Sequence, residues 1–373
     1  MTPARLVFLD LARGLATLMM VQGHTLDALL SDDYRAAGAF HLWTFVRGLT
    51  PSMFLLFSGF AFAVATERRW AHHLLSGLSN TRRFRRFGFF LLLGYLLHFP
   101  VSRLIDLPFM PHERWRSFIV VDALQCIAIT LMLLQGLVLA TRTPRRLAVA
   151  ALCGGLAVAM LTPWVWRGDW SALLPLPVAA YLSPAIGSPF PLFPWSAYTF
   201  IGAALGGLYL GRGARDPVAF AIRVLAGGGA LLVVLAVIGA RVPLEPFGST
   251  DFWTTSPNQF FLRTGLVFLV LGVVMLASHR VSSGHSLLRM VAEESLTIYF
   301  VHLCIVYGSV WNSGLSQVYG RSLSLGPALG TVALLWLSVV ALAGAWNWCK
   351  RRHAPVARRL RIAAVVLLLA KLA

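Results

Sequence analysis

The chain has 373 residues, of which 58% are hydrophobic and 12% are charged, and its formal net charge is +18. A mean hydropathy of +0.73 excludes an ordinary soluble globular protein and indicates a protein that crosses a membrane several times. The arginines lie between apolar stretches and do not form a soluble basic domain, so we do not expect nucleic acid as a partner.

Apolar stretches of about 18–25 residues predict membrane helices, and the fold is therefore predicted to be all-α and polytopic, with about ten spans. These stretches cover residues 6–30, 43–65, 85–104, 118–140, 146–164, 190–211, 218–240, 261–279, 291–311 and 325–348. The last apolar run, residues 362–373, is short for a span, and an interfacial helix and an eleventh span are both left open. We divide the chain into a transmembrane domain, residues 1–348, and a basic cytoplasmic tail with a short apolar end, residues 349–373.

The basic residues between these spans favour one orientation in the membrane. With the N-terminus inside, 21 lysines and arginines fall in cytoplasmic segments and seven fall in the opposite loops. Because cytoplasmic loops of membrane proteins are enriched in lysine and arginine, this threefold bias predicts that the N-terminus and the tail are both cytoplasmic.

The first stretch, residues 6–30, carries four ionisable groups on one face. At about 100° per residue, Asp10, Arg13, His24 and Asp27 share a single stripe. From Asp10 to Asp27 the stripe rises about 25 Å, close to the thickness of the hydrocarbon core. Since an ionisable group inside a membrane normally faces the protein interior or a wet cavity, we expect a polar path along this helix.

Other spans contribute polar and aromatic side chains to the outer half of the membrane. With the N-terminus inside, that half collects His24, His41, His98, Asp122, Gln125 and Trp195. His302 lies in the middle of the ninth span, where a histidine needs a partner. Histidine suits general base catalysis, because its ordinary pKa of about 6.5 leaves a neutral acceptor near pH 7.

Purely structural interpretations of these residues stay open. Asp10 and Arg13 are three residues apart and are also compatible with a buried ion pair, and His98 with an interfacial position. Asp27, one turn beyond His24, is placed to orient the His24 ring. The sequence has no HExxH, GxSxG or GxxxxGK[ST] motif, and its four cysteines have no metal-like spacing, so we expect no metal cofactor.

The segment LDLARGLATLMMVQGH resembles the first-helix signature of integral-membrane acyltransferases. The matching positions are Asp10, Arg13, Gly14 and His24. In O-acyltransferases of the acyltransferase-three type the last position is histidine, as here. In the lysosomal heparan-alpha-glucosaminide N-acetyltransferase group it is a catalytic asparagine, and His24 departs from that pattern.

Four further segments are more similar to the second group and its bacterial relatives. FHLWTFVRGLTPSMFLLFSGFAFA resembles the segment in which a histidine regarded as catalytic precedes a Pro-containing helix, and that position is His41. VDALQCIAI, FPLFPWSAYTFIGAALG and SLTIYFVH resemble the fourth-helix, sixth-helix and late motifs. The resemblance covers most of residues 5–310 in order.

The resemblance implies an enzyme that takes an acyl group, usually acetyl, from acetyl-CoA on the cytoplasmic side. The acceptor is an extracytoplasmic sugar or another polar molecule. It implies roles for His41 as general base or transient acyl carrier, for His24 as its support or substitute, and for Arg13 with Asp10 at the donor pocket. The residues expected to contact the substrate are Asp122, Gln125, Trp195 and His302.

Two other interpretations of the polar path remain. A transporter or exporter would use the stripe to conduct a small polar or lipid-linked solute, and a non-catalytic membrane partner would use it to hold helices together. We expect a multi-pass protein of a bacterial inner membrane, surrounded by lipid. The acceptor, the transfer to nitrogen or oxygen and a homodimeric state are left open.

Overall fold

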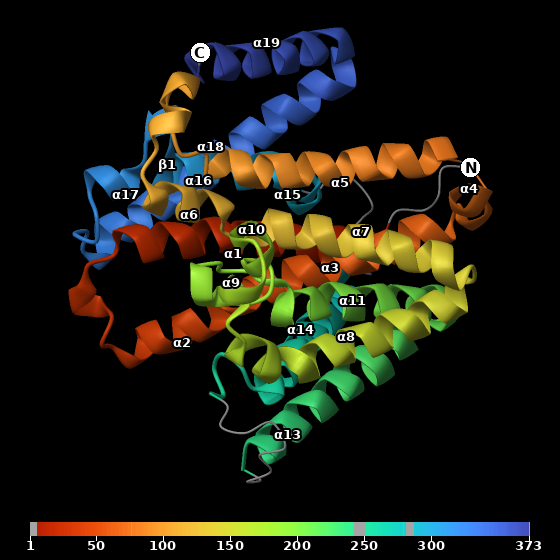
Figure 1. Cartoon of the computed structure of the whole chain (residues 1–373). Coiled ribbons are helices and arrows are strands. Elements are labelled where there is room, and N and C mark those ends of the chain that lie inside the picture. Colours follow the sequence, from red (N-terminus) through yellow and green to blue (C-terminus); the bar gives the residue numbers. More distant parts are fainter. Residues whose placement is uncertain (1–5, 76, 242–250, 279, 281–286, 373) are drawn as a thin grey trace. The chain divides into compact units, whose positions relative to one another are not determined.

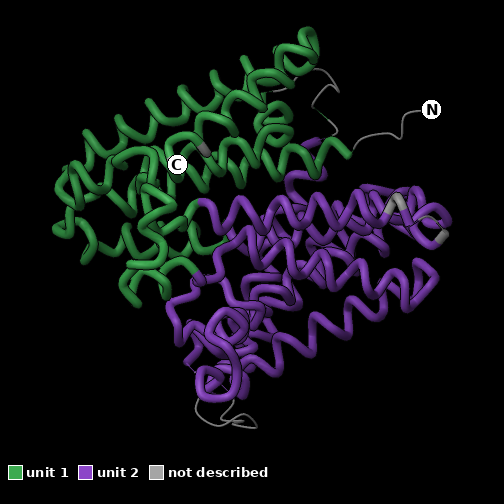
Figure 2. Tube along the Cα trace, turned by 45° about the horizontal axis from the view of Figure 1, so that its top comes forward, with its two compact units in different colours: residues 1–50, 97–118, 280–373 green, residues 51–96, 119–279 purple. Residues whose placement is uncertain are grey.

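The structure is a computed structural model that describes residues 6–372 except 76, 242–250, 279 and 281–286. The described part is almost entirely helical, which confirms the predicted all-α class, and its one named sheet is a two-stranded hairpin. The chain forms two compact units (Figure 2). Unit 1 comprises residues 1–50, 97–118 and 280–373, and unit 2 comprises residues 51–96 and 119–279.

Unit 1 joins the first helix to the C-terminal part of the chain (Figure 1). Its elements are α1 (Val7–Leu29), η1 (Asp32–Tyr34), α2 (Gly38–Arg47), η2 (Leu104–Phe109), α6 (His112–Ile119), α15 (Leu287–Glu293), α16 (Ser295–Tyr307), β1 (Gly308–Ser309), β2 (Asn312–Ser313), α17 (Leu315–Val318), α18 (Leu325–Arg352) and α19 (Ala354–Leu372).

Helix α1 packs against α15, α16 and α18 in unit 1. The apolar core between them includes Leu29, Ile298 and Val339, all almost completely buried. Gly14 permits the close approach of α15, because a Cβ atom there would lie 2.3 Å from the carbonyl oxygen of Leu288. Of the polar stripe of α1, Asp10 is buried, while Arg13, His24 and Asp27 are half-buried.

Unit 2 contains the middle of the chain. Its elements are α3 (Leu49–Glu67), α4 (Trp70–Leu75), α5 (Gly77–Leu97), α7 (Ala123–Thr141), α8 (Pro144–Arg167), α9 (Trp170–Leu173), α10 (Leu176–Ala179), η3 (Pro184–Ile186), α11 (Leu192–Leu208), the π-helical segments η4 (Tyr209–Gly213) and η5 (Phe220–Gly227), α12 (Pro217–Ala219), α13 (Gly228–Arg241) and α14 (Pro257–Ser278).

Two glycines let α3 and α11 cross closely in unit 2. A Cβ atom on Gly59 would lie 1.8 Å from the carbonyl oxygen of Thr199, and one on Gly202 would lie 1.9 Å from that of Leu56. Both distances are far below van der Waals contact. Small residues at such crossings are typical of membrane helix packing, where close backbone approach supplies the contact area.

The number of helices suited to span a membrane is lower than predicted. Six helices in the described residues are long and apolar enough, and a seventh is counted if α15 and α16, bent by 79°, form one broken span. Three of the ten predicted spans become helices that are too polar or too short: α1 carries the stripe, α5 begins on a run of arginines, and α11 has 17 residues. The helices still make the chain a multi-pass membrane protein.

The end of the chain forms a helix that returns along α18. The indole Nε1 of Trp311 donates a hydrogen bond to the carbonyl of Leu368 at 3.2 Å, and the Lys371 ammonium donates to the carbonyl of Trp311. Trp311 lies shortly before the start of α18, whereas α19 begins just after the end of α18. The two helices are therefore antiparallel (Figure 1).

Candidate active site

The histidine of the first helix lies beside the histidine of α16. The ring centroids of His24 and His302 are 5.4 Å apart, and Nδ1 of His24 is 3.1 Å from the hydroxyl of Tyr307. Tyr307 is the last residue of α16, five positions after His302. Two expected site residues, His24 and His302, thus meet in unit 1, together with a tyrosine that sequence reasoning did not select.

The hydrogen bond of His302 defines its tautomer. The ring is completely buried, and its Nδ1 lies 2.8 Å from the carbonyl oxygen of Ile298. A carbonyl only accepts hydrogen bonds, so Nδ1 carries the proton and Nε2 carries a lone pair. Nε2 has no hydrogen-bond partner in the described part of the chain. A buried acceptor left unpaired costs about 1–3 kcal/mol, and such a group calls for a ligand or a functional role.

A short hairpin fixes the position of Tyr307. Gly308 follows it with a φ of +85°, a conformation that favours glycine, and leads into the antiparallel pair β1 and β2. Gln317 donates from Nε2 to the carbonyl of Tyr307 at 3.1 Å, and Asn312 donates from Nδ2 to the carbonyl of Cys304 at 2.7 Å. The turn after α16 is therefore cross-linked to the helix end that carries the tyrosine.

Tyr307 also lines an open hollow of about 520 Å³ in unit 1. The hollow lies between the segment that follows α5 and the hairpin that follows α16. Its lining residues are Leu97, His98, Phe99, Pro100, Ser102, Arg114, Ser117, Tyr307, Gly308, Ser309, Val310 and Gln317. Its volume falls within the range of about 300–1,000 Å³ that is usual for small-molecule sites. The histidine pair is thus connected through Tyr307 to a space large enough for a substrate.

Among the described residues, neither His41 nor Asp27 contacts the His24–His302 pair. His41 is exposed on α2 and makes no side-chain hydrogen bond, ion pair or ring contact with another described residue. Asp27 does not orient His24 in the expected way. Its carboxylate accepts from Arg35 at 3.3 Å and from Arg47 at 3.1 Å, so it joins α1 to α2 and to the turn before it.

The N-terminal end of the stripe lies against the break between α15 and α16. Arg13 donates from Nη2 to the hydroxyl of Ser295 at 3.1 Å, and Asp10 is 6% exposed. Next to Ser295, the 2% exposed Glu294 forms an ion pair with Lys350 and accepts from Asn347. The broken helix is therefore held by charged groups on α1 and α18.

The other expected site residues belong to unit 2. Asp122 caps α7, where its carboxylate accepts from the amide of Ala123 at 2.7 Å. Gln125, one turn on, is completely buried, and neither polar atom of its amide has a hydrogen-bond partner among the described residues. The amide packs against Gly94, since a Cβ atom there would lie 2.4 Å from Oε1.

Trp195 lies in an aromatic group with a cation above it. The centroid of the Trp195 ring is 4.8 Å from that of Phe190 and 5.9 Å from that of Tyr198. The guanidinium carbon of Arg263 is 5.8 Å from the Trp195 centroid. Sequence reasoning missed Arg263, because it lies inside an otherwise apolar stretch. A cation in a membrane helix is itself a signal for function and would have identified it.

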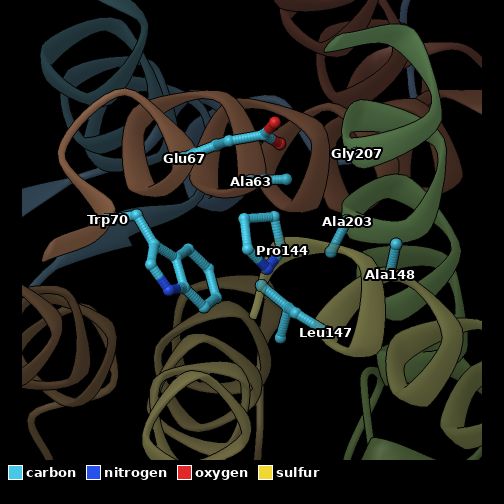
Figure 3. Close-up of a pocket in the computed structure, with 8 residues that line it drawn as sticks. All are labelled: Ala63, Glu67, Trp70, Pro144, Leu147, Ala148, Ala203 and Gly207. Atoms are coloured by element: carbon cyan, nitrogen blue, oxygen red, sulfur yellow. The ribbon is translucent and has the colours of Figure 1, made fainter. Parts of the chain in front are cut away.

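Unit 2 also contains a small cavity, shown in Figure 3. Its lining residues come from α3, α4, α8 and α11 and include Glu67, Trp70 and Gly207. A volume of about 10 Å³ has room for about one water molecule, which is too small for a substrate. Among the described residues, no group of three or more His, Cys, Asp or Glu side chains could hold a metal ion.

Comparison with known families agrees with the motifs. The family model for the catalytic domain of heparan-alpha-glucosaminide N-acetyltransferase matches residues 5–239, which is more than half of the chain. No curated protein matches the chain. The matched range contains α1 with His24, α2 with His41, the cap of α7 and the aromatic start of α11. The chain therefore belongs to the heparan-alpha-glucosaminide N-acetyltransferase catalytic-domain family.

Proposed function

We propose that the protein transfers an acetyl group from acetyl-CoA to a polar acceptor, a sugar hydroxyl or amine, on the opposite side of the membrane. The observation that carries the proposal is the family match over residues 5–239. The paired histidines of unit 1 support it, because His24 supplies a basic nitrogen in contact with Tyr307, which lines an open hollow.

In the proposed reaction His24 is the general base. With Nδ1 donating to the Tyr307 oxygen, Nε2 carries the lone pair that takes the proton of the acceptor. The acceptor oxygen or nitrogen then attacks the thioester carbonyl, a C–O or C–N bond forms, the C–S bond breaks, and CoA leaves as the thiol with that proton. His302 receives a hydrogen bond from the substrate at its unpaired Nε2.

The proposal also assigns the two ends of α1 to donor and acceptor. We propose that the N-terminus is cytoplasmic, that the ten predicted segments cross or enter the membrane, and that Arg13 with Asp10 lines the donor side. The arginine-rich segments of that side then lie where the phosphates of CoA arrive. Asp122, Gln125 and Trp195 remain proposed contacts of the substrate.

His41 remains the other proposed catalytic residue. The resemblance supports it, whereas the hydrogen bond to Tyr307 and the neighbouring lone pair of His302 support His24. His41 is exposed on α2, where a substrate can reach it. His24 and His41 are therefore both compatible with catalysis of acetyl transfer. The relative loss of activity on removal of each ring decides between them.

The test measures release of CoA thiol by the purified protein, with acetyl-CoA and a panel of amino sugars, neutral sugars and glycans. We expect acceptor-dependent release, and a decrease in kcat of about 10²–10⁴-fold for His24→Ala, which is the usual contribution of a general base. His41→Ala is compared directly. His353→Ala, a histidine at the end of α18 next to Trp348, is the matched control and keeps normal activity.

Two results contradict the proposal. One is the absence of CoA release with every acceptor while a labelled solute crosses proteoliposomes, which is the behaviour of a transporter. The other is a normal kcat for both His24→Ala and His41→Ala. Binding of CoA is followed separately by thermal shift, since a ligand at 100 times its Kd stabilises a protein by about 2.7 kcal/mol.

A further inference from the structure

The hollow beside Tyr307 is lined by a guanidinium and by no carboxylate. Arg114, on α6, is one of its lining residues, and none of the residues that line the hollow is an aspartate or a glutamate. Arg114 donates from Nη1 to the carbonyl of Pro100 at 3.3 Å and forms no ion pair with another residue of the described part of the chain. A guanidinium has five N–H donors, so Arg114 retains donors for a ligand.

The rest of the lining fits a molecule with hydroxyl groups. Ser102, Ser117 and Ser309 contribute hydroxyls, and Gln317 contributes an amide. Phe99 and Tyr307 contribute aromatic rings. The Phe99 ring packs edge-to-face against the Phe118 ring, with 6.0 Å between the ring centroids. Aromatic rings beside hydroxyl and amide groups suit the apolar and polar surfaces of a sugar, while a guanidinium suits a carboxylate or a phosphate, which it binds in a bidentate manner.

We propose that the acceptor is an anionic sugar whose carboxylate or phosphate is bound by Arg114 in this hollow. The inference rests on the proposed function, because it places the acceptor next to Tyr307 and therefore next to His24. His98 and the serines contact its hydroxyl groups. The anionic group binds at Arg114, and the hydroxyl or amine that receives the acetyl group points toward His24.

The hollow suits the acceptor better than the donor. With the N-terminus inside, the segments that line the hollow, 97–117 and 307–317, lie on the side opposite the cytoplasm. CoA arrives from the cytoplasmic side and is far larger than a single sugar. An anionic acceptor and CoA therefore bind at the same time, and CoA does not displace the sugar.

The test is equilibrium binding to the full-length protein in detergent, with no need for turnover. The probes are glucose, glucuronate and glucose 6-phosphate. We expect at least one charged sugar to bind about tenfold or more tightly than glucose. Arg114→Gln reduces its affinity to that of glucose, and Arg114→Lys gives an intermediate affinity. Comparison of glucuronate with glucose 6-phosphate distinguishes a carboxylate acceptor from a phosphate acceptor.

Arg116→Gln is the matched control, because Arg116 lies on the same helix and does not line the hollow. We expect it to bind the charged sugars as the wild type does. The inference is overturned if glucose binds as tightly as both charged sugars, if none of the three binds, if Arg114→Gln and Arg116→Gln behave alike, or if excess CoA displaces the sugar. Failure of the proposed function gives a different result: the charged sugar binds through Arg114, but no CoA is released.

Discussion

His73 is a buried base in a positive environment. It lies on α4 of unit 2 and is 5% exposed. Its burial, together with the charges of Arg83, His72 and Arg69, lowers its pKa to about 4 from an ordinary value near 6.5. Arg83 is itself held by hydrogen bonds to Gln135 at 2.8 Å and Thr66 at 3.0 Å. The folded protein therefore keeps His73 neutral at pH values where the unfolded chain protonates it.

This shift predicts a loss of stability in acid. Between about pH 6.5 and pH 4 the unfolded chain binds a proton that the folded protein does not, so the free energy of unfolding falls as the pH falls through that window. Above pH 6.5 the contribution is complete and constant. Over the whole window it amounts to at most about 3 kcal/mol.

The measurement is the Tm in detergent at pH 7.5, 5.5 and 4.5 for the wild type and for His73→Gln. We expect the variant to lose less Tm than the wild type on acidification. Parallel losses in the two proteins would show that His73 is not the titrating group.

The residues of the candidate site were partly predictable. His24 and His302 were identified from the cost of a histidine inside an apolar helix, and the structure brings them to 5.4 Å. Tyr307 and Arg114 were not identified, since a tyrosine near the end of a span and an arginine between two predicted spans are common interfacial residues. Only the hairpin and the segment after α5, which fold against each other in unit 1, bring these two side chains to one hollow.

At the scale of the element, the α3–α11 crossing depends on Gly59 and Gly202. Gly202→Ala would place a methyl group 1.9 Å from the Leu56 carbonyl oxygen, so the helices must move apart. We expect a loss of about 1–3 kcal/mol, the usual cost of an overpacked core. Gly136→Ala on α7 is the control, because nothing lies within 4 Å of the added atom, and we expect it to be neutral or slightly stabilising.

Denaturation curves or Tm values in detergent compare these two variants with the wild type. Equal stabilities of Gly202→Ala and Gly136→Ala would contradict the tight crossing. Small residues four apart on one helix, such as Gly202 and Gly206, are typical of close packing between membrane helices. The sequence did not identify the partner helix, because spacing along one helix carries no information on which neighbour fills the groove.

Helix positions followed well from hydropathy, while the suitability of each helix as a span did not. Helix α1 was predicted at residues 6–30 and is observed at Val7–Leu29. Its polar stripe makes it a weak span by composition, yet α15, α16 and α18 pack around it. Packing between helices decides whether polar groups are tolerated inside the protein. The hydropathy of a single segment does not show which helices pack against it.

At the scale of the whole molecule, we propose that α19 crosses the membrane as an eleventh span, although its arginines keep it outside the helices that are apolar enough by composition. If α18 and α19 both cross the membrane, residues 351 and 371 lie on opposite sides, and Lys371 meets the hairpin that follows α16 through the carbonyl of Trp311. The 19 residues of α19 extend for about 28 Å at 1.5 Å per residue, close to the hydrocarbon thickness.

A membrane-impermeant thiol reagent tests this topology in a cysteine-free background. Applied to intact cells, it should label Lys371→Cys and leave Arg351→Cys unlabelled until the membrane is permeabilised. Equal labelling of both positions before permeabilisation, or of neither, would contradict the antiparallel crossing and favour an interfacial helix.

Acetyl transfer at the His24 centre is the central claim, and the fate of a labelled acetyl group tests it most directly. The purified protein is incubated with acetyl-CoA labelled in the acetyl group and with the acceptor that releases most CoA. We expect the label on the acceptor in equal amount to the CoA released, and its loss in His24→Ala but not in His353→Ala. Label that never leaves CoA in the presence of any acceptor, or that transfers equally well in His24→Ala, would contradict the account.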